Sequence, residues 1–418
     1  MKKTLSLALV ITTVASTAFC ASEVNRPSGI RLGKRMTLRP YVSMSYTFDS
    51  NIDHDHTERA GSIWIVSPAM DMIYKSDNWD VSARAWYDYH AYEGYHKQLN
   101  ASSYGETFSL KWNDKNPKGW NLVLTERYQK ISQDDDLSNH GGRGLGRDRQ
   151  LFTVDSVLGH RFTEKIHASV AGGYYYLDYD NSQKSYGTLY GWRRALAGGE
   201  VGYAFSKWFD FLISGSYQWY WQDNFENKNV WDTPPNTTSE KLANNSSGYT
   251  VSTGIGSHLT ERISYRALLG WSRFEYAKGL SNRDNVTYSL SANWKASDTL
   301  SIMLLGSSYY QPSEVYYGSS MMVSTIGLGV GKSLVRGKLS ATLDLTYRHE
   351  ETQYQTLAGT GFDEDIITGR VGLNYNINRF VSLFGRVEYQ TTMTSGQYYG
   401  SIYDYDRFRG TLGLRLSY

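Results

Sequence analysis

The chain of 418 residues carries 43 basic and 41 acidic side chains. This balance excludes the strongly basic surface typical of nucleic-acid-binding proteins, so no nucleic-acid partner is expected. The 35 tyrosines, 39 glycines and only 7 prolines favour one large β architecture. The mean hydropathy of −0.50 does not exclude a membrane β-barrel, because lipid-facing residues alternate with polar lumen-facing ones in such a protein.

Residues 1–20 are predicted to be a secretory signal peptide. Two lysines precede the apolar run Leu5–Val14, and the small-residue cleavage region ends at Cys20. The run is too short for a membrane-spanning helix, which needs about 20 apolar residues. A lipidated Cys20 is the alternative, but Phe19 fits that motif badly. Cleavage removes the only cysteine, and it also removes Lys2 and Lys3, which leaves 41 basic and 41 acidic residues.

A polar leader follows over residues 21–35, and residues 36–418 are predicted to form the barrel. In the first strand, residues 37–49, Val42, Met44 and Phe48 alternate with Ser43, Ser45 and Thr47. This period of two predicts a strand with one apolar and one polar face. Further strands are expected to start near Trp64, Trp79, Ser103, Trp120, Arg149, Lys165, Tyr190, Trp208, Gly248, Arg262, Asn285, Thr299, Met321, Lys338, Asp365, Phe380 and Asp404.

The last segment, residues 404–418, shows the same alternation and ends on an aromatic residue, Tyr418. Closing this strand against the first one removes the free backbone edges that promote aggregation. An apolar alternation that ends on an aromatic residue resembles the assembly signal of bacterial outer-membrane β-barrels. The resemblance implies the barrel-assembly machinery as a partner.

Short connections alternate with long ones along the chain. The short ones, such as Ser76-Asp77-Asn78, are polar turns, whereas residues 133–148 and 223–247 form much longer loops. This asymmetry predicts an all-β, transmembrane, antiparallel up-and-down β-barrel of about eighteen strands, with both termini in the periplasm. Sixteen strands is the alternative, because residues 248–257 make a weak strand.

Aromatic residues on the predicted outward face form two belts, as membrane interfaces favour, so outer-membrane lipid is an expected partner. The belt near the short turns contains Trp79, Trp112, Trp120, Phe205, Phe209, Trp294, Tyr375 and Tyr418. The belt near the long loops contains Tyr46, Phe48, Tyr89, Tyr128, Tyr176, Trp219, Trp271, Tyr347 and Tyr389.

The first strand ends in the stretch Tyr46-Thr47-Phe48-Asp49-Ser50-Asn51-Ile52. This stretch resembles a feature of the family known as putative β-barrel porins of Gram-negative outer membranes. Those proteins often carry an aromatic-x-aromatic-Asp-Ser-Asn stretch after the first strand. The resemblance implies an outer-membrane barrel, sometimes associated with polysaccharide handling, and it names no substrate.

Charged residues on the inward face of the strands are candidates for lining a pore. They are Arg39, Asp71, Arg84, Asp88, Arg127, Asp155, Asp344, Arg370, Arg386, Glu388 and Arg409. Arg370, Arg386 and Arg409 lie on consecutive strands at similar depth, which predicts either a basic ladder that favours anions or arginines that brace the wall through ion pairs. We therefore expect at most a weak anion preference.

Two loops offer further hypotheses. The third long loop either folds into the pore as a constriction or stays at the surface, and its charged residues are Asp134, Asp135, Asp136, Arg143 and Arg147. The first loop holds Asp49, Asp53, His54, Asp55 and His56, which suit either a divalent ion or solvation, and the solvated loop is preferred because no flanking geometry supports a site. No metal or other cofactor is predicted.

No enzyme activity is predicted either. His90 beside Asp88 and His349 beside Glu350 lack a recognisable set of catalytic partners. The predicted function is passive diffusion of small hydrophilic solutes through an outer-membrane pore. The alternative is a non-conducting surface or scaffold barrel whose long loops bind, or help to export, polysaccharide. The sequence does not predict the oligomeric state.

Overall fold

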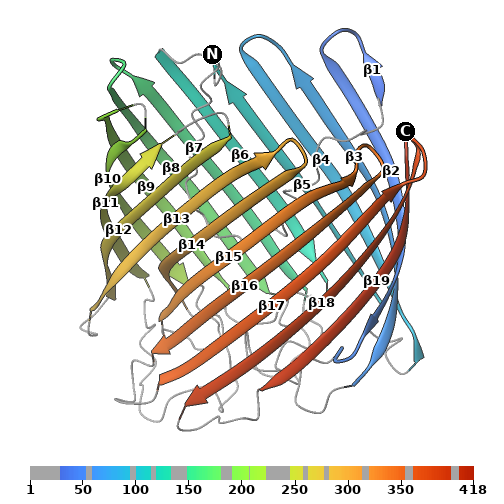
Figure 1. The fold of residues 1–418 in the computed structure, drawn as a ribbon. Coiled ribbons are helices and arrows are strands. Elements are labelled where there is room, and N and C mark those ends of the chain that lie inside the picture. The colour runs from blue at the N-terminus through green and yellow to red at the C-terminus, as the bar shows by residue number, and fades with distance from the viewer. Residues whose placement is uncertain are drawn as a thin grey trace.

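The computed structural model describes residues 29–52, 59–94, 100–113, 119–132, 148–179, 191–206, 208–222, 245–257, 262–276, 282–312, 320–353, 361–396 and 404–418. These residues form one antiparallel sheet that closes on itself (Figure 1). Its strands are β1 (Ile30–Leu32), β2 (Met36–Asp49), β3 (Gly61–Lys75), β4 (Trp79–Tyr92), β5 (Ala101–Trp112), β6 (Gly119–Ile131), β7 (Arg149–Arg161), β8 (Ile166–Tyr179), β9 (Trp192–Ala204), β10 (Asp210–Gln222), β11 (Asn245–Ser257), β12 (Ile263–Tyr276), β13 (Arg283–Ser297), β14 (Leu300–Pro312), β15 (Ser320–Val335), β16 (Leu339–Gln353), β17 (Gly361–Asn376), β18 (Val381–Gly396) and β19 (Tyr405–Ser417).

Each strand from β2 to β19 pairs with its sequence neighbours, and β19 pairs with β2 to complete the ring. The prediction of an eighteen-stranded up-and-down barrel is therefore confirmed, and the alternative of sixteen is wrong. The weak segment near Gly248 does form a strand, because Val251 and Ile255 point outward while Ser252 and Gly256 point inward. Among the described residues, no helix is long and apolar enough to span a membrane.

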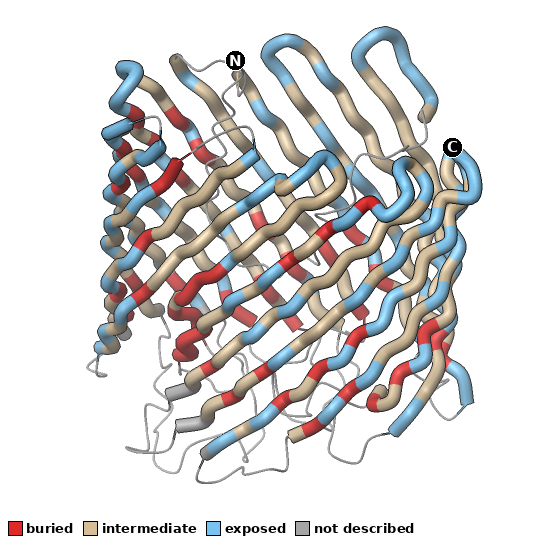
Figure 2. The backbone as a smooth tube through the Cα atoms, viewed as in Figure 1, coloured by how far each residue is buried: buried red, intermediate tan, exposed pale blue. Residues whose placement is uncertain are grey.

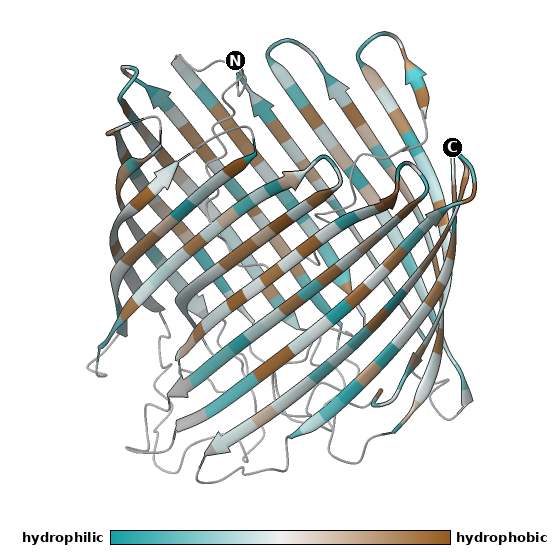
Figure 3. Cartoon of the chain, in the orientation of Figure 1, coloured by the Kyte–Doolittle hydropathy of each residue, from teal (hydrophilic) through white to brown (hydrophobic). Residues whose placement is uncertain are grey.

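The two faces of the strands differ in polarity throughout the ring. Figure 3 shows apolar and polar residues alternating along most strands. On β16, for example, Leu345 and Tyr347 are exposed on the outside, whereas Asp344, Thr346 and Arg348 point inward. Figure 2 shows the same alternation as changes in burial along most of the strands. Because a barrel wall is one sheet thick, the outward apolar side chains can be covered only by lipid or by another protein.

The two ends of the barrel differ in the length of their connections. Short turns and the C-terminus lie at one end, which we call the short-turn end, and the other end is the loop end (Figure 1). At the β15–β16 turn, Gly337 has a φ of 77°, a left-handed conformation that glycine adopts at little cost. The Lys338 N–H closes this turn by donating to the Val335 carbonyl at 2.9 Å.

The predicted leader contributes one short strand. Residues 30–32 form β1, which pairs with the start of β2 through Ile30–Leu38 and Leu32–Met36. Beside it, the N–H of Tyr418 donates to the carbonyl of Pro40 at 3.1 Å, so β1 continues the line in which β19 ends. The predicted signal peptide, residues 1–20, lies outside the described residues.

The outward face of β16 tests the membrane assignment. We expect Leu345→Arg to destabilise the barrel by about 2–4 kcal/mol, because it places a guanidinium among the lipid chains near the middle of the strand. Thr346→Arg, one residue along on the inward face, is the matched control and should cost far less. Denaturant unfolding in phospholipid vesicles measures both. Equal losses in the two variants would contradict the assignment of the faces.

Candidate functional site

A row of alternating charges crosses five neighbouring strands on the inner wall. Cross-strand pairing places Asp344 of β16 opposite Arg370 of β17, Arg370 opposite Glu388 of β18, Glu388 opposite Arg409 of β19, and Arg409 opposite Asp49 of β2. The Arg370 guanidinium contacts the Glu388 carboxylate directly, and Arg409 lies 3.9 Å from the same carboxylate. Opposite charges in directly paired positions stabilise a sheet, so this row ties together the strands at which the ring closes.

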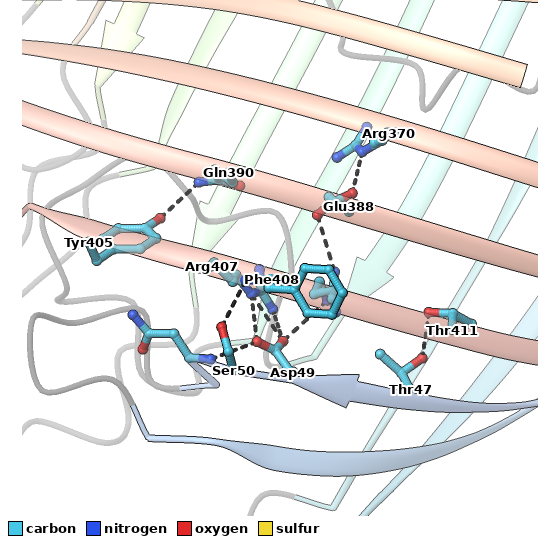
Figure 4. A network of polar contacts seen from close by, with 12 residues as sticks. Thr47, Asp49, Ser50, Arg370, Glu388, Gln390, Tyr405, Arg407, Phe408 and Thr411 are labelled. Atoms are coloured by element: carbon cyan, nitrogen blue, oxygen red, sulfur yellow. Dashed lines mark hydrogen bonds and ion pairs between the residues drawn. The ribbon is translucent and has the colours of Figure 1, made fainter.

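The closing clasp, which we define as Asp49, Arg407 and Arg409, forms the end of this row. Arg407 donates from Nε to both carboxylate oxygens of Asp49 at 3.0 Å, and the Nε atom of Arg409 lies 3.2 Å from Asp49 Oδ2. The side chains of Arg407 and Asp49 are 1% and 0% exposed. Figure 4 shows these contacts at the junction of β2 and β19.

The two residues after Asp49 also bind β19. The N–H of Ser50 donates to the carbonyl of Phe408 at 2.9 Å, and the Phe408 N–H donates back to the Ser50 hydroxyl at 2.8 Å. The Asn51 amide donates to the Asp406 carbonyl at 3.3 Å, and its backbone N–H donates to Asp49 at 3.0 Å. The Asp-Ser-Asn stretch therefore has a structural task, which is to hold the first strand of the ring to the last.

All the predicted pore-lining residues lie on inward positions of their strands. Arg370 and Arg409 make ion pairs, which supports bracing of the wall rather than a ladder of free charges. Arg386 is opposite Gly372 and Thr411 instead of an acid, it makes no ion pair with any described residue, and it is exposed to the lumen. Of the three arginines, Arg386 is therefore the one that faces the lumen without an acid in a directly paired position.

A second charged group lies on β2, β3 and β4. Cross-strand pairing places Arg39 opposite Asp71, and Asp71 opposite Arg84. The Arg84–Asp71 distance is 3.9 Å, and the Arg84 side chain is 48% exposed. Two guanidinium groups flank the Tyr41 ring, Arg84 at 5.7 Å and Arg415 at 5.0 Å from its centroid. Sequence reasoning missed Tyr41 and Arg415, although their strand parity already pointed inward.

The remaining predicted residues are spread around the ring. Asp88, Arg127 and Asp155 lie on the inner faces of β4, β6 and β7. The charged residues of the predicted constriction loop, Asp134–Asp136, Arg143 and Arg147, lie outside the described residues, as do Asp53, His54, Asp55 and His56 of the first loop. The described part of the chain contains no cluster suited to a metal ion, and Asp49 is occupied by the two arginines of the closing clasp.

The two histidines considered for catalysis have different surroundings. His90 and Asp88 both face the lumen on β4. His349 faces outward and Glu350 inward, so the predicted neighbours lie on opposite sides of the wall. His349 instead contacts Asp365 at 2.9 Å, and Tyr347 donates to the same carboxylate at 2.7 Å. This trio lies on the outer face near the loop end, outside the lumen.

The inner faces of β8, β9, β10 and β12 are apolar near the loop end. They contribute Leu177, Tyr179, Trp192, Tyr220 and Phe274 to a buried aromatic cluster that also contains Tyr310 of β14 and Met322 of β15, with Tyr175 packed against it. The inward parity of Trp192, Tyr220 and Phe274 was visible in the sequence. Their proximity was not, because they come from different strands.

Comparison of the sequence with models of protein families identifies the family of this chain. A model of the family described as "Putative beta-barrel porin 2" matches residues 25–418. The chain belongs to this family. It is therefore an outer-membrane β-barrel related to porins, and membership favours a transport protein over an enzyme.

Solved structures of outer-membrane proteins show a weaker likeness to this porin-family chain. The siderophore receptor PirA from Acinetobacter baumannii is 9% identical, with 92% of this chain and 81% of that one covered and a TM-score of 0.45. The outer membrane protein OpdK from Pseudomonas aeruginosa is 13% identical, with coverage of 93% and 100% and a TM-score of 0.42. OccAB4 from Acinetobacter baumannii is 10% identical, with coverage of 92% and 99% and a TM-score of 0.40. No curated protein matches the sequence.

The closing clasp makes a stability prediction. Removing one partner of a buried ion pair leaves a charge without compensation and costs about 3–5 kcal/mol. We therefore expect Asp49→Asn and Arg407→Gln each to lower the free energy of unfolding strongly, and the double variant to lose less than the two single losses combined. Arg386→Gln, which breaks no ion pair, is the control. Strictly additive losses would show that the two side chains do not stabilise the closure together.

Proposed function

We propose that this porin-family barrel forms a channel for the passive diffusion of small hydrophilic solutes, saccharides among them, across the outer membrane. The observation that carries the proposal is the charged inner wall of an eighteen-stranded ring. Barrels of 16 to 18 strands are wide enough to leave an aqueous channel. The proposal includes delivery by a cleaved signal peptide, residues 1–20, and folding by the barrel-assembly machinery.

The charges on the wall require water in the lumen. Arg386 and Arg415 are exposed on inward positions and make no ion pair with a described residue, and Arg84 lies no closer than 3.9 Å to Asp71. A guanidinium without a partner in a dry cavity would be very costly. Solvation of these groups thus supports a hydrated path along the wall from β16 to β4.

The same groups support a weak preference for anions. The clasp and the charge row pair Arg370, Arg407 and Arg409 with acids, so these arginines contribute little to selectivity. Arg84, Arg386 and Arg415 remain exposed to the lumen. Positive groups that line a water-filled pore raise the local concentration of anions.

Planar-bilayer recording tests the channel directly. We expect purified protein to produce discrete conductance steps, because the lumen is hydrated. Heat-modifiable mobility on a gel must first show that the barrel is folded. Folded protein that never conducts would contradict the channel and would favour a scaffold barrel that acts through its loops.

Reversal potentials measured across a KCl gradient test the selectivity. We expect a weak preference for chloride in the wild type, and a shift toward potassium in Arg386→Ala with Arg415→Ala. Arg193→Ala, on the outward face of β9, removes the same charge outside the lumen and should leave the potential unchanged. Identical potentials in all three proteins would show that the wall arginines do not select ions.

A further inference from the structure

The loop ends of β14 and β15 differ from every other part of the wall that the structure describes in detail. We call residues 307–312 and 320–323 the inner tip. In the inner tip, the side chains on both faces of the strands are buried. The buried residues are Ser307, Ser308, Tyr310, Gln311, Pro312, Ser320, Met321, Met322 and Val323. A strand in the wall of an isolated barrel exposes its outward side chains, as β15 itself does at Ile326 and Leu328. Burial on both faces indicates that the tip has left the outer wall.

The backbone ladder shows where it leaves. Pairing between β13 and β14 ends at Ser289 and Ser307, although β13 continues to pair with β12 as far as Arg283. Beyond that point the N–H of Tyr288 donates to the hydroxyl of Ser308 at 2.9 Å instead of to a backbone carbonyl. The inner tip remains paired within itself and with β16.

A hydrogen bond between two strands that are not neighbours, β10 and β14, places the tip inside the lumen. The Tyr220 hydroxyl of β10 donates to the Tyr310 carbonyl of β14 at 2.9 Å. Along the wall, β10 and β14 are separated by β11, β12 and β13, a path of about 19 Å at the usual strand spacing. A tyrosine side chain does not span that distance. The end of β14 must therefore fold inward to meet Tyr220, which points inward itself.

Aromatic rings hold the tip in that place. Ring centroids are 4.3 Å apart for Tyr175 and Trp192, 6.1 Å for Trp192 and Tyr220, 5.3 Å for Tyr220 and Phe274, and 5.7 Å for Phe274 and Tyr310. These separations are those of favourable aromatic pairs. The chain of rings runs from β8 to the inner tip, so the tip is fastened to the inner faces of β8, β9, β10 and β12.

A buried ion pair crosses the same side of the lumen nearer the short-turn end. Arg266 of β12 contacts Glu200 of β9 at 2.5 Å, although two strands lie between them, and it also contacts the Ser289 hydroxyl at 3.4 Å. Glu200 is 7% exposed. Side chains therefore occupy the space beside β9 to β13, whereas Arg84, Arg386 and Arg415 on the wall from β16 to β4 are exposed.

We propose that the inner tip and the aromatic cluster form the constriction that limits the size of solutes entering the channel from the loop end. This inference rests on the proposed channel function and adds its size-selective element. Solutes pass between the inner tip and the wall formed by the strands from β16 to β4. The Tyr220–Tyr310 hydrogen bond and the aromatic contacts fix the width of this passage.

Loosening the fastening should widen the passage. We expect Tyr220→Ala with Phe274→Ala to raise single-channel conductance on the order of twofold and to admit larger uncharged sugars in liposome-swelling assays. Tyr220→Phe, which removes only the hydroxyl, should have a smaller effect in the same direction. Trp219→Ala with Trp271→Ala is the matched control, because it removes two outward rings from the same strands. Unchanged conductance and size limit in the first, folded variant would overturn the constriction.

A readout that does not depend on conductance separates this inference from the channel proposal. In Met322→Cys, the buried thiol should react slowly with a small, charged, membrane-impermeant thiol reagent, and adding Tyr220→Ala should speed labelling at least about tenfold, since burial limits access. Asp406→Cys, at an exposed position, is the reactivity control. Faster labelling without any conductance would keep the fastened tip and refute the channel. If the protein conducts and the single variant Met322→Cys, without Tyr220→Ala, is already labelled rapidly, the channel proposal stands and the fastened tip is refuted.

Discussion

Closure of β19 onto β2 is the constraint on which the rest of this barrel depends. Inside a bilayer every backbone N–H and carbonyl needs a partner within the protein, so an open first or last strand is not tolerated. Here the two strands lie at opposite ends of the sequence, and the closing clasp makes their pairing specific. The buried Asp49–Arg407 pair fixes one register, because a shift by one residue would turn Arg407 outward into lipid. The alternating charge row fixes the pairing register of the strands from β19 back to β16 in the same way.

The two sides of the closed lumen are lined by different kinds of side chain. The wall that contains the seam, from β16 to β4, is lined by arginines and carboxylates, some paired and some solvated. The wall from β8 to β13 is lined near the loop end by aromatic rings that receive the inner tip. A solute that enters would thus meet charges on one side and an apolar obstruction on the other.

Much of the fold followed from the sequence because period-two alternation records which way each side chain points. The weak strand β11, at Val251 and Ile255, and the inward position of every predicted pore residue came from parity, and the up-and-down strand order came from the alternation of short and long connections. Pairing partners did not. The sequence placed Arg370, Arg386 and Arg409 at similar depth and left open a basic ladder or ion-paired bracing of the wall. Strand register aligns Arg370 with Glu388 and Arg409 with Asp49 and gives Arg386 no acid opposite. The inner tip was also missed, since Tyr310 and Met322 lie on regular strands and only their contacts with Tyr220 and Phe274 show that the strands turn inward.

The proposed hydrated channel is narrower at the loop end, where the inner tip folds inward, than at the short-turn end. Polymer exclusion in planar bilayers tests it most directly. Polyethylene glycols of graded size are added to one side at a time, and the drop in single-channel conductance reports which sizes enter. We expect larger polymers to enter from the short-turn side than from the loop side. Equal size limits from the two sides, or the absence of any conductance from folded protein, would contradict it.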